Sequence, residues 1–153
     1  MPLARRLDRA AYDLAALRRL APGVEFRDDP FTLKRRSRDH FWFSPIARAA
    51  LEGRIADLVA LPRDVEEVEA VAAACARLRV PLVARGAGTG TYGQAVPLHG
   101  GVVLDLSGLD RILETTPHAV RAEAGARIDR VDAAARAAGG ELRMHPSTKR
   151  QAT

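Results

Sequence analysis

Cysteine, lysine and aromatic residues are scarce in this chain of 153 residues, and long apolar runs are missing from it. The single cysteine, Cys75, has no partner for an internal disulfide, and no group of cysteines and histidines has the spacing of a metal site. No apolar run approaches the length of a membrane-spanning helix or a signal peptide. We therefore expect a cytoplasmic protein with a reduced, buried thiol and no metal site.

Lysine is so rare that arginine supplies almost all of the positive charge. Of 24 basic residues only Lys34 and Lys149 are lysines, and the net charge is +5. A basic protein can bind nucleic acid, and the basic cluster at residues 34–38, followed by aromatics at 41–43, could contact single strands. Because no known nucleic-acid module surrounds this cluster, we favour a solvated segment beside a buried aromatic anchor and expect no nucleic-acid partner.

Residues 1–53 are predicted to form an N-terminal helical extension. Apolar residues recur every three or four positions from residue 3 to residue 21, which predicts an amphipathic helix that ends at Pro22. Residues 24–45 look irregular, and a short helix is expected at residues 46–51. The regular pattern of a folded domain begins after this extension.

A strand–helix–strand unit follows the extension. Residues 55–60 read as the first strand, and Asp64 with Glu67 three residues later forms a capping box that starts a helix running to Leu78. Residues 82–84 read as the second strand. In such a unit the strands are parallel, so the loop after residue 84 lies at a carboxyl strand end, where ligands commonly bind.

Short strands and helices also alternate in the rest of the chain. The expected elements are a strand at 102–106, a short element at 109–113, a strand at 120–124, a helix at 129–138 and a strand at 141–145. No element closes the last sheet before Thr153. We therefore expect the N-terminal fragment of a longer protein.

The loop between residues 84 and 102 is rich in glycine, with glycines at positions 86, 88, 90 and 93. Alternating glycines let successive backbone N–H groups point into one concavity, which suits the oxygens of a phosphate. The hydroxyls of Thr89 and Thr91 and the amide of Gln94 add donors. Arg85 adds a charge that serves either an anion or a structural carboxylate.

Three interpretations of this loop compete. A P-loop needs Lys-Ser or Lys-Thr after its last glycine, whereas Gln94 and Ala95 follow Gly93. A Rossmann fingerprint opens a helix, but here the chain runs on into another strand. A glycine-rich connection without a ligand stays open as the third interpretation.

The loop Arg-Gly-Ala-Gly-Thr-Gly-Thr-Tyr-Gly-Gln, with Gly-Val-Val-Leu-Asp-Leu after it, resembles the FAD pyrophosphate loop of the vanillyl-alcohol oxidase / p-cresol methylhydroxylase (PCMH-type) family. The likeness extends to Leu-Pro-Arg-Asp-Val-Glu-Glu-Val before the loop, and to Ala-Glu-Ala-Gly-Ala and His-Pro-Ser-Thr-Lys-Arg-Gln-Ala-Thr after it. It implies a PCMH-type FAD-binding domain at residues 54–153, with two α+β subdomains on either side of FAD. The second subdomain would be incomplete in this chain.

The same resemblance implies the residues that bind FAD. The pyrophosphate would be bound by five loop residues and flanked by three more, and a second segment would lie near the flavin ring or ribityl chain. In that order the implied residues are Gly86, Ala87, Gly88, Thr89 and Gly90; Arg85, Gly93 and Gln94; and Pro146, Ser147, Thr148, Ala152 and Thr153. Some relatives attach the flavin covalently through a histidine at the position of Thr89, so non-covalent FAD is expected here.

The implied activity is that of an FAD-linked oxidoreductase, in which hydride passes from a CH–OH carbon to the flavin and then to oxygen, a quinone or another carrier. The loop most resembles the glycolate/D-lactate dehydrogenase branch, which suggests a 2-hydroxy acid as the small-molecule substrate. No catalytic residue is predicted, because His145, beside the second segment, is better explained by an ordinary polar contact. A non-catalytic flavin-binding remnant and a nucleic-acid-binding protein remain as alternatives.

Overall fold

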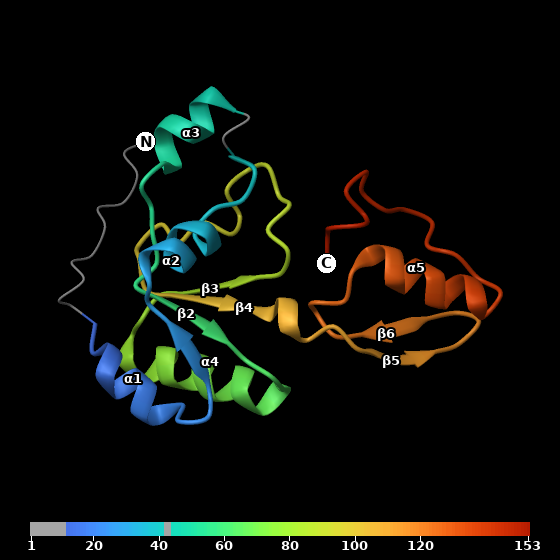
Figure 1. Ribbon diagram of the computed structural model, residues 1–153. Coiled ribbons are helices and arrows are strands. Elements are labelled where there is room, and N and C mark those ends of the chain that lie inside the picture. Colours follow the sequence, from blue (N-terminus) through green and yellow to red (C-terminus); the bar gives the residue numbers. More distant parts are fainter. Residues whose placement is uncertain (1–11, 42–43) are drawn as a thin grey trace.

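The computed structural model describes residues 12–41 and 44–153, which form two lobes (Figure 1). The larger lobe is built on a four-stranded sheet in the order β1-β2-β4-β3. β1 pairs antiparallel with β2, whereas β2 and β3 each pair parallel with β4. The strands span Glu25–Arg27 (β1), Leu58–Leu61 (β2), Leu82–Arg85 (β3) and Val102–Asp105 (β4).

Helices cover both faces of this sheet, which is why its central strands β2 and β4 are apolar except at Asp105, the last residue of β4. α1 (Leu14–Leu20) and α4 (Val65–Leu78) pack on one face with the side chains of Leu58 and Val102. α2 (Pro30–Arg36) packs on the opposite face with Val59 and Val103, the next residue along each strand (Figure 1). α3 (Pro45–Leu51) lies beyond α2.

The predicted strand–helix–strand unit is confirmed, with β2 three residues later than expected at its start. Asp64 caps α4 by accepting a hydrogen bond from the Glu67 N–H. Glu67, however, accepts from the backbone N–H of Arg63, one residue before the cap, so the reciprocal half of the capping box is shifted. Cys75 is buried on the apolar side of α4, as expected.

The prediction that residues 24–45 are irregular is wrong. β1 forms there because its backbone pairs with β2 far along the chain, a contact that local sequence does not reveal. α2 forms there because Asp29 caps a helix that begins with Pro30. The helix expected up to residue 21 is seen as α1, and its predicted part at residues 1–11 lies outside the described residues. The division at 53/54 stays a prediction.

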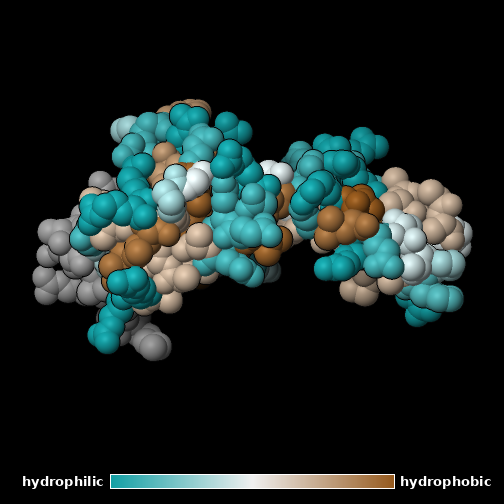
Figure 2. All heavy atoms as spheres, turned by 90° about the horizontal axis from the view of Figure 1, so that it is seen from below, coloured by the Kyte–Doolittle hydropathy of each residue, from teal (hydrophilic) through white to brown (hydrophobic). Residues whose placement is uncertain are grey.

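The smaller lobe follows β4 through a short 3₁₀ turn, η3 (Leu106–Gly108). It consists of an antiparallel pair, β5 (Ile112–Thr115) and β6 (Val120–Ala122), covered by α5 (Ile128–Ala137) (Figure 1). The two lobes are joined through a narrower waist (Figure 2). At this waist Gly125 packs so closely that an added Cβ would overlap the carbonyl oxygen of Leu106.

The strand expected at residues 141–145 is wrong, because that stretch is irregular. It pairs with neither β5 nor β6, and the Leu142 N–H bonds to the side chain of Asp132 on α5 instead. The chain then turns back over the start of α5. There the carbonyls of Lys149 and Ala152 accept hydrogen bonds from the first N–H groups of the helix, whose cap residue offers no side-chain acceptor.

Candidate functional site

The glycine loop begins at the carboxyl end of β3 and is shaped by close approaches that only glycine allows. Gly88 has φ +70°, and a Cβ there would overlap the guanidinium of Arg85. A Cβ on Gly86 would overlap the hydroxyl of Thr153. The loop backbone is therefore held against two polar side chains, one from β3 and one from the far end of the described chain.

The loop lines a cavity of about 270 Å³ together with Asp39 and Thr153. Within the described residues, the N–H groups of Gly88, Thr89 and Gly90 donate hydrogen bonds to no other part of the chain. These consecutive donors line the cavity beside the hydroxyl of Thr89 and the amide of Gln94. Such a set of donors fits the oxygens of a pyrophosphate.

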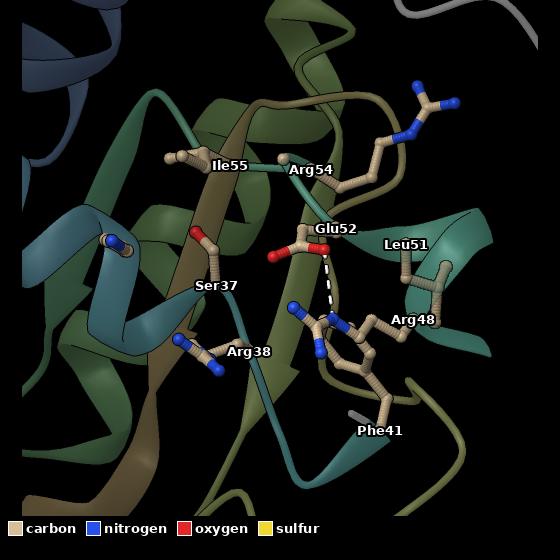
Figure 3. Close-up of a pocket in the computed structure, with 10 residues that line it drawn as sticks. Ser37, Arg38, Phe41, Arg48, Leu51, Glu52, Arg54 and Ile55 are labelled. Carbon is tan, nitrogen blue, oxygen red and sulfur yellow. Dashed lines mark hydrogen bonds and ion pairs between the residues drawn. The ribbon is translucent and has the colours of Figure 1, made fainter. Parts of the chain in front are cut away.

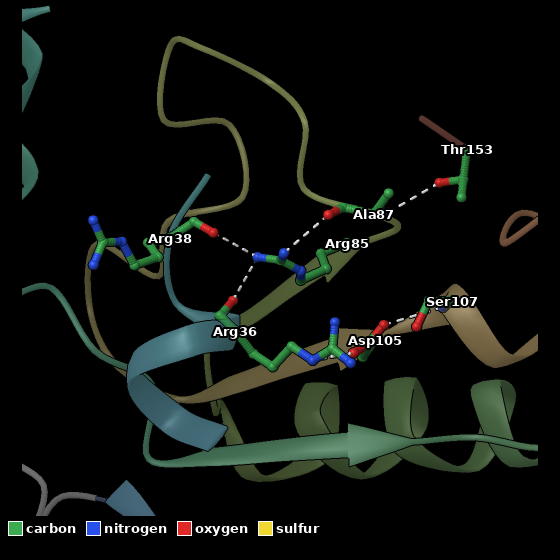
Figure 4. Close-up of polar contacts among 7 residues, drawn as sticks. All are labelled: Arg36, Arg38, Arg85, Ala87, Asp105, Ser107 and Thr153. Carbon is green, nitrogen blue, oxygen red and sulfur yellow. Dashed lines mark hydrogen bonds and ion pairs between the residues drawn. The ribbon is translucent and has the colours of Figure 1, made fainter. Parts of the chain in front are cut away.

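The C-terminal segment reaches the loop from the smaller lobe through Thr153. Its Oγ1 accepts a hydrogen bond of 3.1 Å from the Ala87 N–H (Figure 4). The turn at residues 147–151 positions Thr153, since Ala152 is buried and its carbonyl binds the first N–H of α5. The two predicted FAD segments, more than 50 residues apart in sequence, thus meet at Ala87 and Thr153.

Arg85, at the end of β3, holds the loop in place through hydrogen bonds to three carbonyls. Its side chain is buried, with 7% of the residue exposed, and Nη1 donates to the carbonyls of Arg36 at 2.9 Å and Arg38 at 2.8 Å. Nη2 donates to the Ala87 carbonyl at 3.2 Å, as Figure 4 shows. Burial lowers the pKa of Arg85, and the nearby carboxylate of Asp105 opposes that shift. Arg85 therefore ties the end of α2 to the loop.

A family model described as "FAD binding domain" matches residues 56–153. The chain belongs to the FAD binding domain family. Two relatives resemble part of it. Glycolate oxidase subunit GlcD of Escherichia coli (strain K12) is 51% identical over 65 residues, which is 42% of this chain and 13% of that one. A probable mitochondrial D-lactate dehydrogenase of Danio rerio is 40% identical over 58 residues, 38% of this chain and 12% of that one.

These matches thus span only 12–13% of the relatives' own length. Solved structures confirm the fold of this FAD binding domain. Alkyldihydroxyacetonephosphate synthase superimposes with a TM-score of 0.76 at 17% identity, over all of this chain and 33% of that one. The 4-ethylphenol oxidase from Gulosibacter chungangensis gives 0.69 at 22% identity, over 95% and 28%. The predicted PCMH-type α+β fold and the predicted family resemblance are confirmed.

The FAD binding domain brings only part of the predicted site together. The loop residues from Gly86 to Gly90, with Gln94, line one cavity with Thr153. Ala152, the residue before Thr153, is buried. Pro146 and Ser147 are exposed and Thr148 is half-buried, and none of these three residues lines that cavity. Gly93 has φ +81°, and a Cβ there would overlap the side chain of Leu51.

Asp39 is a cavity residue that sequence reasoning missed. It is 1% exposed and lines both the glycine-loop cavity and a neighbouring cavity of about 570 Å³. Its Oδ1 accepts from the Phe41 N–H, and its Oδ2 has no hydrogen-bond partner in the described chain. A lone aspartate in a segment without periodicity gives no signal in the sequence, because only the fold carries it to the loop.

The basic cluster at residues 34–38 lies at the end of α2, and one of its arginines pairs with a carboxylate inside the domain. Arg36 forms an ion pair of 2.8 Å with the buried carboxylate of Asp105 (Figure 4), and Phe41 is buried as the expected aromatic anchor. A cavity of about 430 Å³ between α2 and α3, crossed by the Arg48–Glu52 pair, contains none of the predicted FAD residues (Figure 3).

Two negative findings hold for the residues that the structure describes. Among them, no three residues of the types His, Cys, Asp and Glu are grouped so that they could hold a metal ion. No helix in the described part of the chain is long and apolar enough to cross a membrane. His145 is exposed in the irregular stretch that follows α5.

Proposed function

We propose that this chain is the FAD-binding portion of an FAD-linked oxidoreductase that oxidises a CH–OH group, with a 2-hydroxy acid as the substrate class. The observation that carries the proposal is that Gly88, Thr89 and Gly90, whose N–H groups find no acceptor among the described residues, line one cavity together with Thr153. The relatives named for glycolate and D-lactate support the substrate class.

In this proposal the loop N–H groups bind the pyrophosphate of FAD, and Thr153 positions the loop from the second segment. FAD, when bound, supplies the redox chemistry, because a flavin accepts the two electrons of a hydride. Arg85 keeps the loop in shape through its three carbonyl partners and adds a buried positive charge behind the cavity. The same two electrons would then leave for oxygen, a quinone or another carrier.

Non-covalent binding is part of the proposal. Thr89 stands where a histidine would make a covalent link, and the loop from Arg85 to Gln94 contains neither histidine nor cysteine. The visible spectrum of the purified chain after addition of FAD and desalting tests this. We expect a retained flavin spectrum, and acid precipitation should release all of the flavin into the supernatant. A chain that retains no flavin contradicts the proposed function.

A pair of variants at one position locates the pyrophosphate. Thr89→Asp places a negative charge among the three N–H groups, and at about 5 Å from a phosphate charge this costs roughly 3 kcal/mol at an effective dielectric constant near 20. We expect FAD affinity to fall by at least about 100-fold. Thr89→Asn has nearly the same size without the charge and should keep FAD binding. Equal affinities in both variants would place the phosphates elsewhere.

Enzyme activity is tested separately from binding. Anaerobic addition of glycolate or D-lactate to the flavin-loaded protein should bleach the flavin absorption near its visible maximum if the bound cofactor is reduced. A retained flavin that no 2-hydroxy acid reduces would favour the alternative, a non-catalytic flavin-binding remnant. The substrate class depends on this measurement and not on the loop.

A further inference from the structure

The carboxylate of Asp39 is buried beside the glycine loop with one oxygen left unpaired. The residue is 1% exposed, and Oδ2 has no hydrogen-bond partner in the described chain. A buried carboxylate oxygen without a donor is costly, by about 1–3 kcal/mol or more for a charged group. Buried polar groups without partners therefore call for an explanation, and a ligand that brings a donor is one.

The backbone fixes this carboxylate against the loop. The Asp39 Oδ1 accepts a 2.9 Å hydrogen bond from the Phe41 N–H, and the next residue, His40, donates its N–H to the Gly90 carbonyl at 2.7 Å. On the other side, the carbonyl of Arg38 accepts from the anchored guanidinium of Arg85. The segment that carries Asp39 is thus attached to both ends of the phosphate-binding turn.

Two acceptor oxygens converge at Gly90. A Cβ built on this glycine would lie 2.7 Å from Gln94 Oε1 and 3.3 Å from Asp39 Oδ2. The two oxygens differ in their partners. Gln94 Oε1 accepts from the Tyr92 N–H, whereas Asp39 Oδ2 accepts from no group of the described chain. The side chain of Gln94 is exposed, so its rotation gives an entering donor access to Asp39.

The negative charge of the Asp39 carboxylate favours a hydroxyl over a phosphate as its ligand group. A carboxylate repels a pyrophosphate, so the phosphates belong on the N–H groups of the loop, and Asp39 needs a neutral donor. In FAD the pyrophosphate is flanked by the hydroxyls of the ribityl chain on one side and of the adenosine ribose on the other. A ligand whose phosphates bind the loop therefore presents sugar hydroxyls within reach of Asp39.

We propose that Asp39 is a cofactor-binding residue whose Oδ2 accepts a hydrogen bond from a sugar hydroxyl of the bound flavin nucleotide. The inference rests on the proposed function, because it requires that FAD binds at this loop. It assigns to a segment before the matched family region a direct part in cofactor recognition.

The test compares the FAD dissociation constants of the wild-type chain, Asp39→Asn and a control, Asp57→Asn, by fluorescence titration. Asn keeps an oxygen for the Phe41 N–H but replaces the acceptor that faces the sugar with an NH2 donor, and the affinity for FAD should fall at least about tenfold. Asp57 is also a buried carboxylate, but its Oδ2 accepts from the N–H of Gly101, just before β4, and neither residue lines the glycine-loop cavity. Asp57→Asn should lower the melting temperature without changing the affinity of the folded protein.

A purely structural role for Asp39 makes the opposite prediction. Removing a negative charge beside the phosphate site would then leave FAD affinity unchanged or increase it, and that result overturns the proposal. An equal loss of affinity in Asp57→Asn would overturn it as well. Failure of the wild-type chain to bind FAD overturns the proposed function itself, so the two failures are distinguishable.

Smaller ligands separate the two sources of the hydroxyl. Titration with FMN, which carries only the ribityl chain, and with ADP, which carries only the ribose, should show the loss in Asp39→Asn for one of them. 2′-Deoxy-ADP distinguishes the ribose further, since a lost hydroxyl should remove the difference between wild type and variant. A loss of the same size for FMN and ADP would indicate a distorted loop and contradict a direct hydrogen bond.

Discussion

The two lobes of this domain differ in what holds them together. In the larger lobe, apolar strands are buried between helices, and both apolar clusters of the described residues belong to it. In the smaller lobe, the few buried residues are mostly alanines, and ion pairs cross the elements instead. Arg111–Glu123 and Arg130–Asp110 join separate segments of this lobe, and Arg136–Asp132 is a third pair within α5.

This difference matters for the site, because the loop belongs to the larger lobe and Thr153 to the smaller one. Exposed ion pairs contribute little to stability, whereas a buried apolar core contributes most of it. We therefore expect a rigid loop and a more easily opened second segment. A bound cofactor would contact both the loop and the second segment. It should therefore stabilise the smaller lobe more than the larger one.

The largest effect is expected from the core of the larger lobe. Leu58→Ala removes a side chain that is 1% exposed at the centre of the sheet, and should cost about 2–5 kcal/mol of unfolding free energy. Leu113→Ala in β5, where the leucine is 48% exposed, should cost about 0.5 kcal/mol or less. Denaturant unfolding measures both, and similar costs would show that the lobes do not differ as described.

A smaller effect is expected at the waist. Gly125→Ala adds a Cβ that overlaps the Leu106 carbonyl oxygen and lies 2.8 Å from that of Leu109, which should cost about 1–3 kcal/mol. Gly140→Ala is the control, because its Cβ would make only ordinary contacts, the nearest at 3.4 Å to the Pro117 carbonyl. If Gly125→Ala melts like its control, the waist is loose enough to adapt.

Within the smaller lobe, Asp132 is the polar centre. It accepts from Arg136 Nε at 3.1 Å and from the Leu142 N–H at 3.2 Å. Asp132→Asn weakens both contacts, and amide exchange in α5 should become several-fold faster while exchange in β2 and β4 stays unchanged. Asp110→Asn, which removes only an exposed pair with Arg130, should leave exchange nearly unchanged. Uniform acceleration across both lobes would mean that they open together.

The smallest effect is a dependence on pH. Hydrogen bonds from Arg136 hold the pKa of Asp132 below its ordinary value, and those from Arg111 do the same for the pKa of Glu123. Their contribution is therefore complete above the unfolded values, near 3.9 and 4.3, and is lost as pH falls through the lower folded values. Hydrogen exchange below about pH 4 should show the smaller lobe opening first. Simultaneous opening would contradict the comparison.

Sequence patterns predicted well those elements whose own residues define them. Helix α4 has its cap at Asp64 and an apolar face, and the strands of the parallel sheet are short apolar runs ended by proline or glycine. The loop was also recognisable from its glycines at 86, 88 and 90. At each of these positions the backbone approaches a side chain so closely that an added Cβ would overlap it. The family follows from these local features.

Other features depend on partners distant in sequence, and no local pattern reveals them. β1 exists because it adds to β2, and in the irregular stretch 141–145 the Leu142 N–H bonds to the side chain of Asp132 and not to a strand. Arg85 donates to the carbonyls of Arg36 and Arg38, partners that no local pattern reveals. That Arg85 also flanks the pyrophosphate stays a prediction.

The sequence by itself determined the fold class, the family and the loop, because backbone conformation and apolar periodicity are local properties of the chain. The tertiary structure alone decided which groups meet there: Thr153 at Ala87, Arg85 under the loop and Asp39 against Gly90. The Arg85–Arg38 and Ala87–Thr153 hydrogen bonds join residues 47 and 66 positions apart, and only the packing of the sheet and the two lobes brings these residues together.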